Sequence, residues 1–395
     1  MTNNKVKTII KALTGGAAAT EAMRQINPDV FSAYPITPQT PIIQSFAQIV
    51  ADKLVDTKFV LVESEHSAMS LVVGASAAGG RAMTATASQG LILMAEVLLV
   101  ASGTRLPIVM NLATRALSAP INIHNDHQDA MAVRDMGWIQ IFCENSQEVY
   151  ENNFLAIRLA EHSQVQLPVM VCQDGFITSH NTTGVEIYPD KVIKKFLKEY
   201  KPKYPLLNLK KPLTIGPLAL PDFYFEIRVQ LDEAMKQAKK RYLEVGKELK
   251  KITGHNYPYF EEYYLDNAQA VIVTMGSTAG TSKVVVDKLR KQGKKVGLLK
   301  INLFRPFPYK EVKKALSKIK YVGVLERAMG FGSYSPLASE IRHCLSSKQL
   351  VQDYTYGLGG RDIGLEEIEK VFKELLKGQI SDQIKYVGLR KQSNK

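Results

Sequence analysis

Cysteine is scarce in this chain. Cys143, Cys172 and Cys344 lie far apart, and none belongs to a Cys-x-x-Cys pair. Iron–sulfur clusters and structural zinc sites need several closely arranged ligands, which dispersed thiols cannot provide. We therefore expect three buried thiols in a reducing compartment and no metal site in this chain.

Long apolar runs are also absent. The longest, residues 90–101, is interrupted by Glu96 and is too short to cross a bilayer. Residues 1–11 lack the apolar core of a signal peptide. These features predict a soluble cytoplasmic protein with no membrane partner.

Several nucleotide-binding and catalytic motifs are incomplete or missing. The segments Gly15-Gly16 and Gly330-Phe331-Gly332 are isolated glycine signals, and neither is part of a full dinucleotide-binding motif. The sequence contains no P-loop and no nucleophile elbow. A stand-alone nicotinamide-dependent dehydrogenase is therefore disfavoured.

Positive charge is in excess, with a formal net charge of +13. The excess lies mainly in lysine-rich helical stretches, residues 236–251 and 310–320, which lack the interleaved aromatics that stack on bases. We interpret these stretches as solvated surface, with docking of acidic partners or phosphates as the alternative. No nucleic-acid partner is expected.

The chain is long enough for two domains, and its first half alternates β-type runs with helical stretches. This alternation predicts a parallel sheet covered on both faces. A helix over residues 90–103, apolar nearly all round, suits packing between the sheet and a neighbouring subunit. Strands are predicted at residues 30–34, 59–62, 82–87, 107–112 and 168–172, and further helices at 40–53 and 67–78.

A second alternating series follows a proline-rich connector at residues 201–221 and a basic helix at 225–251, which ends near Gly254. We expect a domain over residues 1–258, whose last part (about 195–258) is the connector and basic helix, and a smaller domain over 259–395. The second series comprises strands at 270–275, 295–303 and 321–326 and helices at 281–292 and 309–319.

Ligands of open α/β sheets bind outside the carboxyl ends of the strands, which here selects Thr37, Glu65 and Arg115. Thr37 lies between Pro35 and Pro38 on a stiff turn, although this segment is also typical of a helix start capped by Thr40. Glu65 is either a buried carboxylate facing a cofactor nitrogen or part of a helix cap. Arg115 either holds a substrate carboxylate or forms a surface ion pair.

A histidine and aspartate group is a weaker candidate for a metal site. His66, His124 and His127 accompany Asp126 and Asp129, and these residue types coordinate zinc. A loop after Pro120 with polar residues on every side is more typical of a hydrogen-bonded turn or a subunit contact. We assign no metal to it.

Ordered motifs extend along nearly the whole chain. They include Tyr-Pro-Ile-Thr-Pro at residues 34–38 and Arg-Ala-Leu-Ser-Ala-Pro-Ile-Asn at 115–122. Further segments lie at residues 62–68, 84–90, 134–138, 174–176, 275–277, 305–308 and 357–362. Together these motifs resemble α subunits of the pyruvate:ferredoxin oxidoreductase family, within the 2-oxoacid:ferredoxin oxidoreductases.

The resemblance implies a fold and an activity. The fold would be a doubly wound, pyrimidine-type thiamine-diphosphate domain followed by a smaller transketolase C-terminal-like α/β domain. The activity would be oxidative decarboxylation of pyruvate to acetyl-CoA and CO2, with electrons passing to ferredoxin. The reverse reaction is that of a pyruvate synthase.

The resemblance also implies roles for individual residues. Glu65 matches the glutamate on the aminopyrimidine ring, where a carboxylate favours the imino tautomer that removes the thiazolium proton. Thr37 and Arg115 match positions that contact the substrate, with Arg115 pairing its carboxylate. Further cofactor contacts are expected from Pro35, Ile36, Ser88 and Gln89.

The segment that holds diphosphate and Mg2+ in such enzymes, Gly-Asp-Gly…Asn, does not occur here. The resemblance implies that a β subunit brings that half together with a [4Fe-4S] cluster. A δ subunit would bring ferredoxin-like clusters, and a γ subunit would complete the assembly. Coenzyme A is the expected co-substrate.

Two alternatives stay open. The substrate could be 2-oxoisovalerate or 2-oxoglutarate, since the segment at residues 34–40 fits pyruvate and branched-chain oxoacid enzymes alike. The chain could instead be a non-catalytic assembly scaffold, against which the joint presence of Thr37, Glu65 and Arg115 argues.

Overall fold

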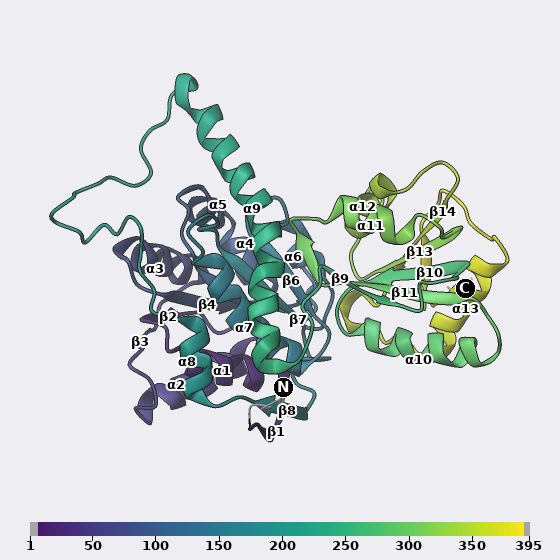
Figure 1. Ribbon diagram of the computed structural model, residues 1–395, viewed down its shortest axis with the longest axis horizontal. Coiled ribbons are helices and arrows are strands. Elements are labelled where there is room, and N and C mark those ends of the chain that lie inside the picture. The colour runs from purple at the N-terminus through teal and green to yellow at the C-terminus, as the bar shows by residue number, and fades with distance from the viewer. Residues whose placement is uncertain (1–6, 391–395) are drawn as a thin grey trace.

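The computed structural model describes residues 7–390, which form two α/β units, each built on its own sheet (Figure 1). The long helix α9, Pro221–Thr253, lies between the two units in the sequence. Figure 1 shows that it packs against the first unit. Residues 1–6 of the segment tested for a signal peptide lie outside the described part. Among residues 7–390, no helix is both long and apolar enough to span a bilayer.

The first unit contains a seven-stranded sheet in the order β12-β6-β7-β5-β4-β2-β3. All neighbours pair in parallel except β12, which runs antiparallel to β6. The five predicted strands are present, and β6 and β12 are additional ones. The strands are β2 Val30–Ser32, β3 Lys58–Val60, β4 Ala82–Thr86, β5 Val109–Thr114, β6 Ile139–Cys143, β7 Val169–Asp174 and β12 Leu303–Arg305.

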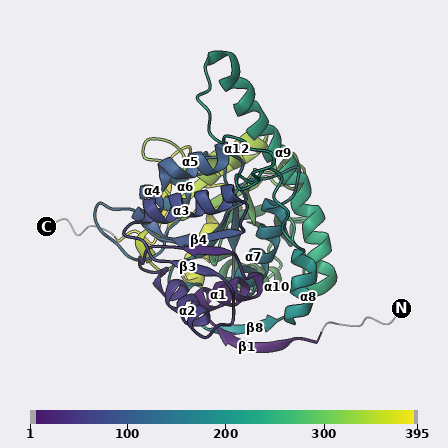
Figure 2. The same ribbon diagram turned by 90° about the vertical axis from the view of Figure 1, so that its left-hand side faces the viewer.

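Helices cover both faces of this sheet, as the alternating sequence predicts (Figure 2). Figure 2 shows α3, α4 and α5 on one side of β3 and β4, and α1 and α2 on the other. Each side has its own apolar core. The helices are α1 Gly15–Ile26, α2 Thr40–Ala51, α3 Glu65–Ala78, α4 Ser88–Leu93, α5 Ala95–Gly103, α6 Gln128–Ala132, α7 Ser146–Ala160 and α8 Asp190–Leu197.

The single helix predicted over residues 90–103 is wrong in one respect. The segment forms two helices, α4 and α5, which meet at Met94. Leu91 and Leu98 are buried in the core, whereas Leu93 and Val100 are exposed. The break lets both short helices pack on the sheet and leaves an apolar stripe on the outside.

The connector and the basic helix follow the sequence prediction closely. Residues 201–220 contain neither helix nor strand, and α9 ends at Gly254, whose left-handed conformation closes the last turn. The helix begins at Pro221 rather than at residue 225, because proline is accommodated in a first helical turn. In Figure 1 the start of α9 and the loop before it project away from the first unit.

The second unit contains a six-stranded sheet in the order β15-β14-β13-β10-β11-β9, with β9 antiparallel to β11. Its strands are β9 Phe260–Tyr263, β10 Ala270–Thr274, β11 Val296–Ile301, β13 Tyr321–Glu326, β14 Leu350–Tyr356 and β15 Lys385–Val387. Its helices are α10 Thr278–Lys291, α11 Tyr309–Leu316, α12 Pro336–Cys344, the short 3-10 turn η1 Leu358–Gly360 and α13 Leu365–Leu376. Near the N-terminus, β1 Ile9–Leu13 pairs antiparallel with β8 Thr183–Ile187.

The two units are interlocked rather than merely linked in sequence. After β11 the chain returns to the first sheet as β12, which pairs with β6. The domain division at residues 258/259 stays a prediction. Residues 303–305, which lie beyond it in the sequence, belong to the first sheet.

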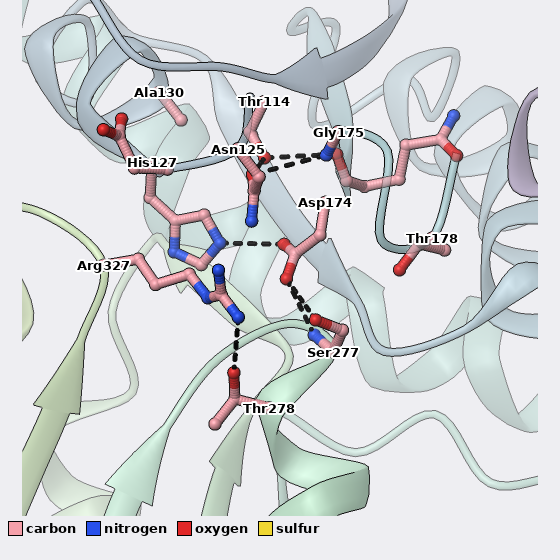
Figure 3. Close-up of polar contacts among 12 residues, drawn as sticks. Thr114, Asn125, His127, Ala130, Asp174, Gly175, Thr178, Ser277, Thr278 and Arg327 are labelled. Carbon is pink, nitrogen blue, oxygen red and sulfur yellow. Dashed lines mark hydrogen bonds and ion pairs between the residues drawn. The ribbon is translucent and has the colours of Figure 1, made fainter. Parts of the chain in front are cut away.

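A buried carboxylate joins the units at the end of β7 (Figure 3). Asp174 accepts hydrogen bonds from the main-chain N–H (3.1 Å) and the hydroxyl (2.6 Å) of Ser277, and bonds to His127 Nε2 at 2.8 Å. Arg327 lies beside them and donates to Thr278 at 3.2 Å. Burial alone would raise the pKa of Asp174, but His127 and Arg327 hold that pKa well below its usual range.

We predict that Asp174→Asn lowers the free energy of unfolding by about 3–5 kcal/mol, because it leaves the buried Arg327 guanidinium without its nearby counter-charge. The folded-state pKa of Asp174 is depressed, so its stabilisation is complete above about pH 4 and falls as the pH drops further. Denaturant unfolding at pH 7 and pH 3 measures both effects. Asp382→Asn, at an exposed position, is the control; an equal effect of the two substitutions would contradict the assignment.

Candidate functional site

The candidate residues follow strands that end at the same edge of the first sheet. Parallel pairing links β2 to β4, β4 to β5 and β5 to β7, and β3 flanks β2. The loops after these strands therefore lie next to one another. Thr37, Glu65, Ser88 and Arg115 belong to four of them.

Arg115 is held by main-chain carbonyl groups from two of these loops. Its Nη1 donates to the Thr37 oxygen at 2.8 Å, and its Nε donates to the Asn122 oxygen at 2.9 Å. The residue is only 6% exposed and forms no ion pair within residues 7–390, so the surface ion-pair alternative is wrong. Burial lowers the pKa of Arg115 and the nearby Asp129 opposes this shift, but an arginine stays charged.

This arrangement leaves Nη2 of Arg115 without an acceptor in the described part of the chain. A buried guanidinium that is fixed by neutral carbonyls keeps its positive charge for another anion. The geometry therefore suits the binding of a small carboxylate.

Thr37 lies on the turn between β2 and α2. The residue is exposed, and its main-chain oxygen accepts the hydrogen bond from Arg115 Nη1. The alternative that this segment is a helix cap is not supported: α2 has Gln39 at its N-cap, and no side chain bonds there. Pro35 is exposed and Ile36 is partly buried on the same turn.

Glu65 is the first residue of α3 and is 7% exposed. The cap of this helix is Ser64, whose hydroxyl accepts from the Ser67 N–H, so Glu65 is not the capping residue. The Glu65 carboxylate makes no hydrogen bond within residues 7–390. Gly90 lies directly against it, since a Cβ there would be 2.7 Å from Glu65 Oε1. A buried carboxylate without a protein partner suits a ligand that donates a hydrogen bond.

Ser88 and Gln89 begin α4. Ser88 is buried with a positive φ of 48°, and its hydroxyl donates to the Ala116 oxygen. Gln89 is partly buried and lies within 2.6 Å of the Ser88 hydroxyl. Both residues therefore lie beside the loop that carries Arg115.

The sequence reasoning missed the role of Asp129. This fully buried residue accepts from the N–H groups of Ser88 at 2.8 Å and Arg115 at 3.0 Å, and so ties together the loops after β4 and β5. Burial raises the pKa of Asp129 to about 8, while these N–H donors oppose the shift. The only sequence signal was an aspartate within a polar loop, which we had considered as part of a metal set.

The residues of that metal set have other contacts. His127 bonds to Asp174 at 2.8 Å, and His66 lies 3.7 Å from Glu96. Within residues 7–390, no three His, Cys, Asp or Glu side chains are grouped closely enough to hold a metal ion.

Exposed apolar side chains surround the site edge. They lie on the loops and on the helix that follow β2, β3, β4 and β5, and an apolar rim of this kind is typical of an interaction surface. Its members are Tyr34, Leu61, Ile92, Leu93, Ile121 and Ile123.

Comparisons with known proteins agree on one family. Residues 21–247 match the thiamine-diphosphate-binding family described as pyruvate flavodoxin/ferredoxin oxidoreductase, and residues 268–368 match pyruvate:ferredoxin oxidoreductase core domain II. Pyruvate synthase subunit PorA from Thermotoga maritima is 53% identical over 96% of this chain and 98% of its own length. Ketoisovalerate oxidoreductase subunit VorA from Pyrococcus abyssi is 39% identical over 98% and 99%.

Solved structures share the fold. A 2-oxoglutarate:ferredoxin oxidoreductase from Magnetococcus marinus superposes with a TM-score of 0.73 at 22% identity, covering 93% of this chain and 65% of that one. A split-gene transketolase superposes with a TM-score of 0.53 at 9% identity, covering 93% and 99%. The predicted α/β fold class is confirmed. The extent and identity of the sequence matches establish that this chain belongs to the pyruvate:ferredoxin oxidoreductase family.

Proposed function

We propose that this chain is the α subunit of a pyruvate:ferredoxin oxidoreductase, which converts pyruvate and coenzyme A reversibly to acetyl-CoA and CO2 with electrons passing to ferredoxin. One observation carries the proposal for the site. A buried carboxylate without a protein partner, Glu65, and a buried guanidinium without an acid partner, Arg115, lie at one sheet edge. Membership of the family supports the overall reaction.

The proposed cofactor is thiamine diphosphate, which when bound would supply the electron sink that decarboxylation of an oxoacid needs. Glu65 fits its aminopyrimidine ring, because an unpaired carboxylate at a glycine-lined position can accept a hydrogen bond from a ring nitrogen. Pro35, Ile36, Ser88 and Gln89 lie on the neighbouring turns and would shape the pocket. The burial of Glu65 away from water strengthens such a bond.

Arg115 orients the substrate in this proposal. Its free donors pair with the carboxylate of the oxoacid, while the carbonyl groups of Thr37 and Asn122 keep the guanidinium in place. The Thr37 hydroxyl lies on the same turn and would bond near that carboxylate. Loss of CO2 weakens the ion pair, so Arg115 selects and positions the substrate rather than driving its decarboxylation.

The remaining parts of the enzyme belong to partner subunits. The sequence lacks the diphosphate-binding segment and has three buried cysteines, so Mg2+ and [4Fe-4S] clusters would come from β and δ subunits, with γ completing the complex. The apolar rim around the site is where the β subunit would close it. We propose a cytoplasmic location, which keeps these thiols reduced.

Pyruvate is favoured over the larger oxoacids, because the pyruvate synthase subunit shares 53% of its residues with this chain and the ketoisovalerate subunit shares 39%. The scaffold alternative predicts that activity does not depend on Glu65 or Arg115. Both alternatives are tested by the following variants.

In the co-purified complex, we expect kcat/KM for ferredoxin reduction to be highest with pyruvate among pyruvate, 2-oxoisovalerate and 2-oxoglutarate. Arg115→Lys should lower kcat/KM for pyruvate about a hundredfold, because lysine loses the two-pronged contact with the carboxylate. The KM for coenzyme A is the internal control. Better turnover of a larger oxoacid would reassign the substrate, and full activity of the variant would favour the scaffold.

Glu65→Gln should reduce turnover by about two to four orders of magnitude, because an amide cannot stabilise the imino tautomer as a carboxylate does. Glu63→Gln is the matched control, since Glu63 is exposed and bonds only to Ser67 within the described residues. The exchange rate of the thiazolium proton, followed by NMR in the loaded complex, should fall for Glu65→Gln alone. Equal exchange in both variants would overturn the assigned role.

Gly90→Ala should displace the Glu65 carboxylate and lower kcat/KM on the order of a hundredfold, because its Cβ would meet both Glu65 and Thr86. Gly74→Ala provides the comparison in α3, where the added Cβ meets nothing within 4 Å. That substitution should raise stability by about 0.5–1 kcal/mol and leave activity intact. Normal activity of Gly90→Ala would show that the Glu65 position does not matter.

A further inference from the structure

The loop that follows Arg115 is attached to the second unit. This loop, residues 116–127, runs from β5 to α6 and contacts the glycine-rich turn η1 at three points. Gly360 N–H donates to the Asn125 oxygen at 2.6 Å, and Gly359 N–H donates to Asp126 Oδ2 at 3.2 Å. Asn122 Nδ2 donates to the Gly359 oxygen at 3.1 Å.

Asn122 faces Arg115 and the second unit at the same time. Its main-chain oxygen accepts from Arg115 Nε at 2.9 Å, while its side chain bonds to Gly359 and accepts from the His124 N–H at 2.7 Å. Since Nε is one of two protein anchors of the guanidinium, a displacement of Asn122 displaces Arg115.

The turn in the second unit requires glycine for this contact. Gly359 and Gly360 have φ values of 60° and 78°, in the left-handed region. A Cβ on Gly359 would overlap the Asn122 amide, and one on Gly360 would overlap the His124 side chain. The backbone of η1 therefore lies directly against the loop.

The outer side of this loop has little other support. Ile121, Ile123 and His124 are exposed in the chain, whereas Asn125 is buried and bonds to Thr114 at 2.7 Å (Figure 3). Asn125 is thus held by both units, through Thr114 and Gly360, whereas the contact of the Asn122 side chain outside its own loop is with Gly359 of the second unit.

We propose that Asn122 is a positioning residue through which Gly359 of the second unit sets the orientation of the Arg115 guanidinium, and thereby the affinity for the substrate carboxylate. The inference rests on the proposed function, in which Arg115 binds that carboxylate. It gives the second unit, remote in sequence from Arg115, a part in substrate selection that acts through Asn122.

The test uses Asn122→Ser in the complete complex. The serine hydroxyl can still accept from the His124 N–H, and the main-chain oxygen remains, but the side chain no longer reaches Gly359. The KM for pyruvate should rise about three- to tenfold, the change that one lost hydrogen bond produces. The kcat, the KM for coenzyme A and the thermal midpoint should stay near those of the unmodified complex.

Gly359→Ala and Gly216→Ala form a matched pair. Both glycines have positive φ, 60° and 72°, so both substitutions strain the backbone, but a Cβ at Gly216 meets nothing within 4 Å. Gly359→Ala should raise the KM for pyruvate, and Gly216→Ala should not. Equal effects of the two would overturn the proposal.

Arg115→Lys separates the outcomes. If it raises the KM for pyruvate and Asn122→Ser does not, the positioning role is refuted and the proposed function stands. If neither variant changes that KM, both the function assigned to Arg115 and this inference fail. Combining the two substitutions should give less than the sum of their separate effects, and strict additivity would contradict a role for Asn122 through Arg115.

Discussion

The buried carboxyl group of Asp129 is the contact on which the arrangement of the site depends. It accepts from the main-chain N–H groups of Ser88 and Arg115, which follow the neighbouring parallel strands β4 and β5. Without it, two buried N–H groups would lose their acceptor, a cost that folded proteins avoid. Arg115 then reaches across to the carbonyl of Thr37, which brings the loop after β2 into the same arrangement.

A second buried carboxylate connects the two units. Asp174 at the end of β7 bonds to Ser277 and His127, and the N–H of His127 donates to the Arg327 oxygen at 2.9 Å. The loop that begins at Arg115 and ends at His127 is therefore fixed at both ends by buried acids. The contacts that hold Arg115 and the contacts that join the two units are thus parts of one polar network.

Much of the fold was predictable because the first unit repeats a simple pattern of buried strand and covering helix. Strand β6 escaped prediction because it is a short run that the polar Gln140 interrupts. Strand β12 could not be assigned to the first sheet, since its pairing with β6 is formed by residues far apart in the chain. Among the site residues, the role of Asp129 was missed because its partners are main-chain N–H groups. A sequence does not show which main-chain groups a side chain will contact.

The sequence by itself determined the alternation of strands and helices, the position of Thr37, Glu65 and Arg115 after strand ends, and the lack of a diphosphate-binding segment. Side-chain type and spacing carry that information directly. Only the tertiary structure decided that the guanidinium of Arg115 is held by carbonyls rather than by an acid, and that Asn122 meets Gly359, 237 residues away. Every residue has a main-chain carbonyl, so which carbonyls become acceptors depends on how the packed chain brings them together.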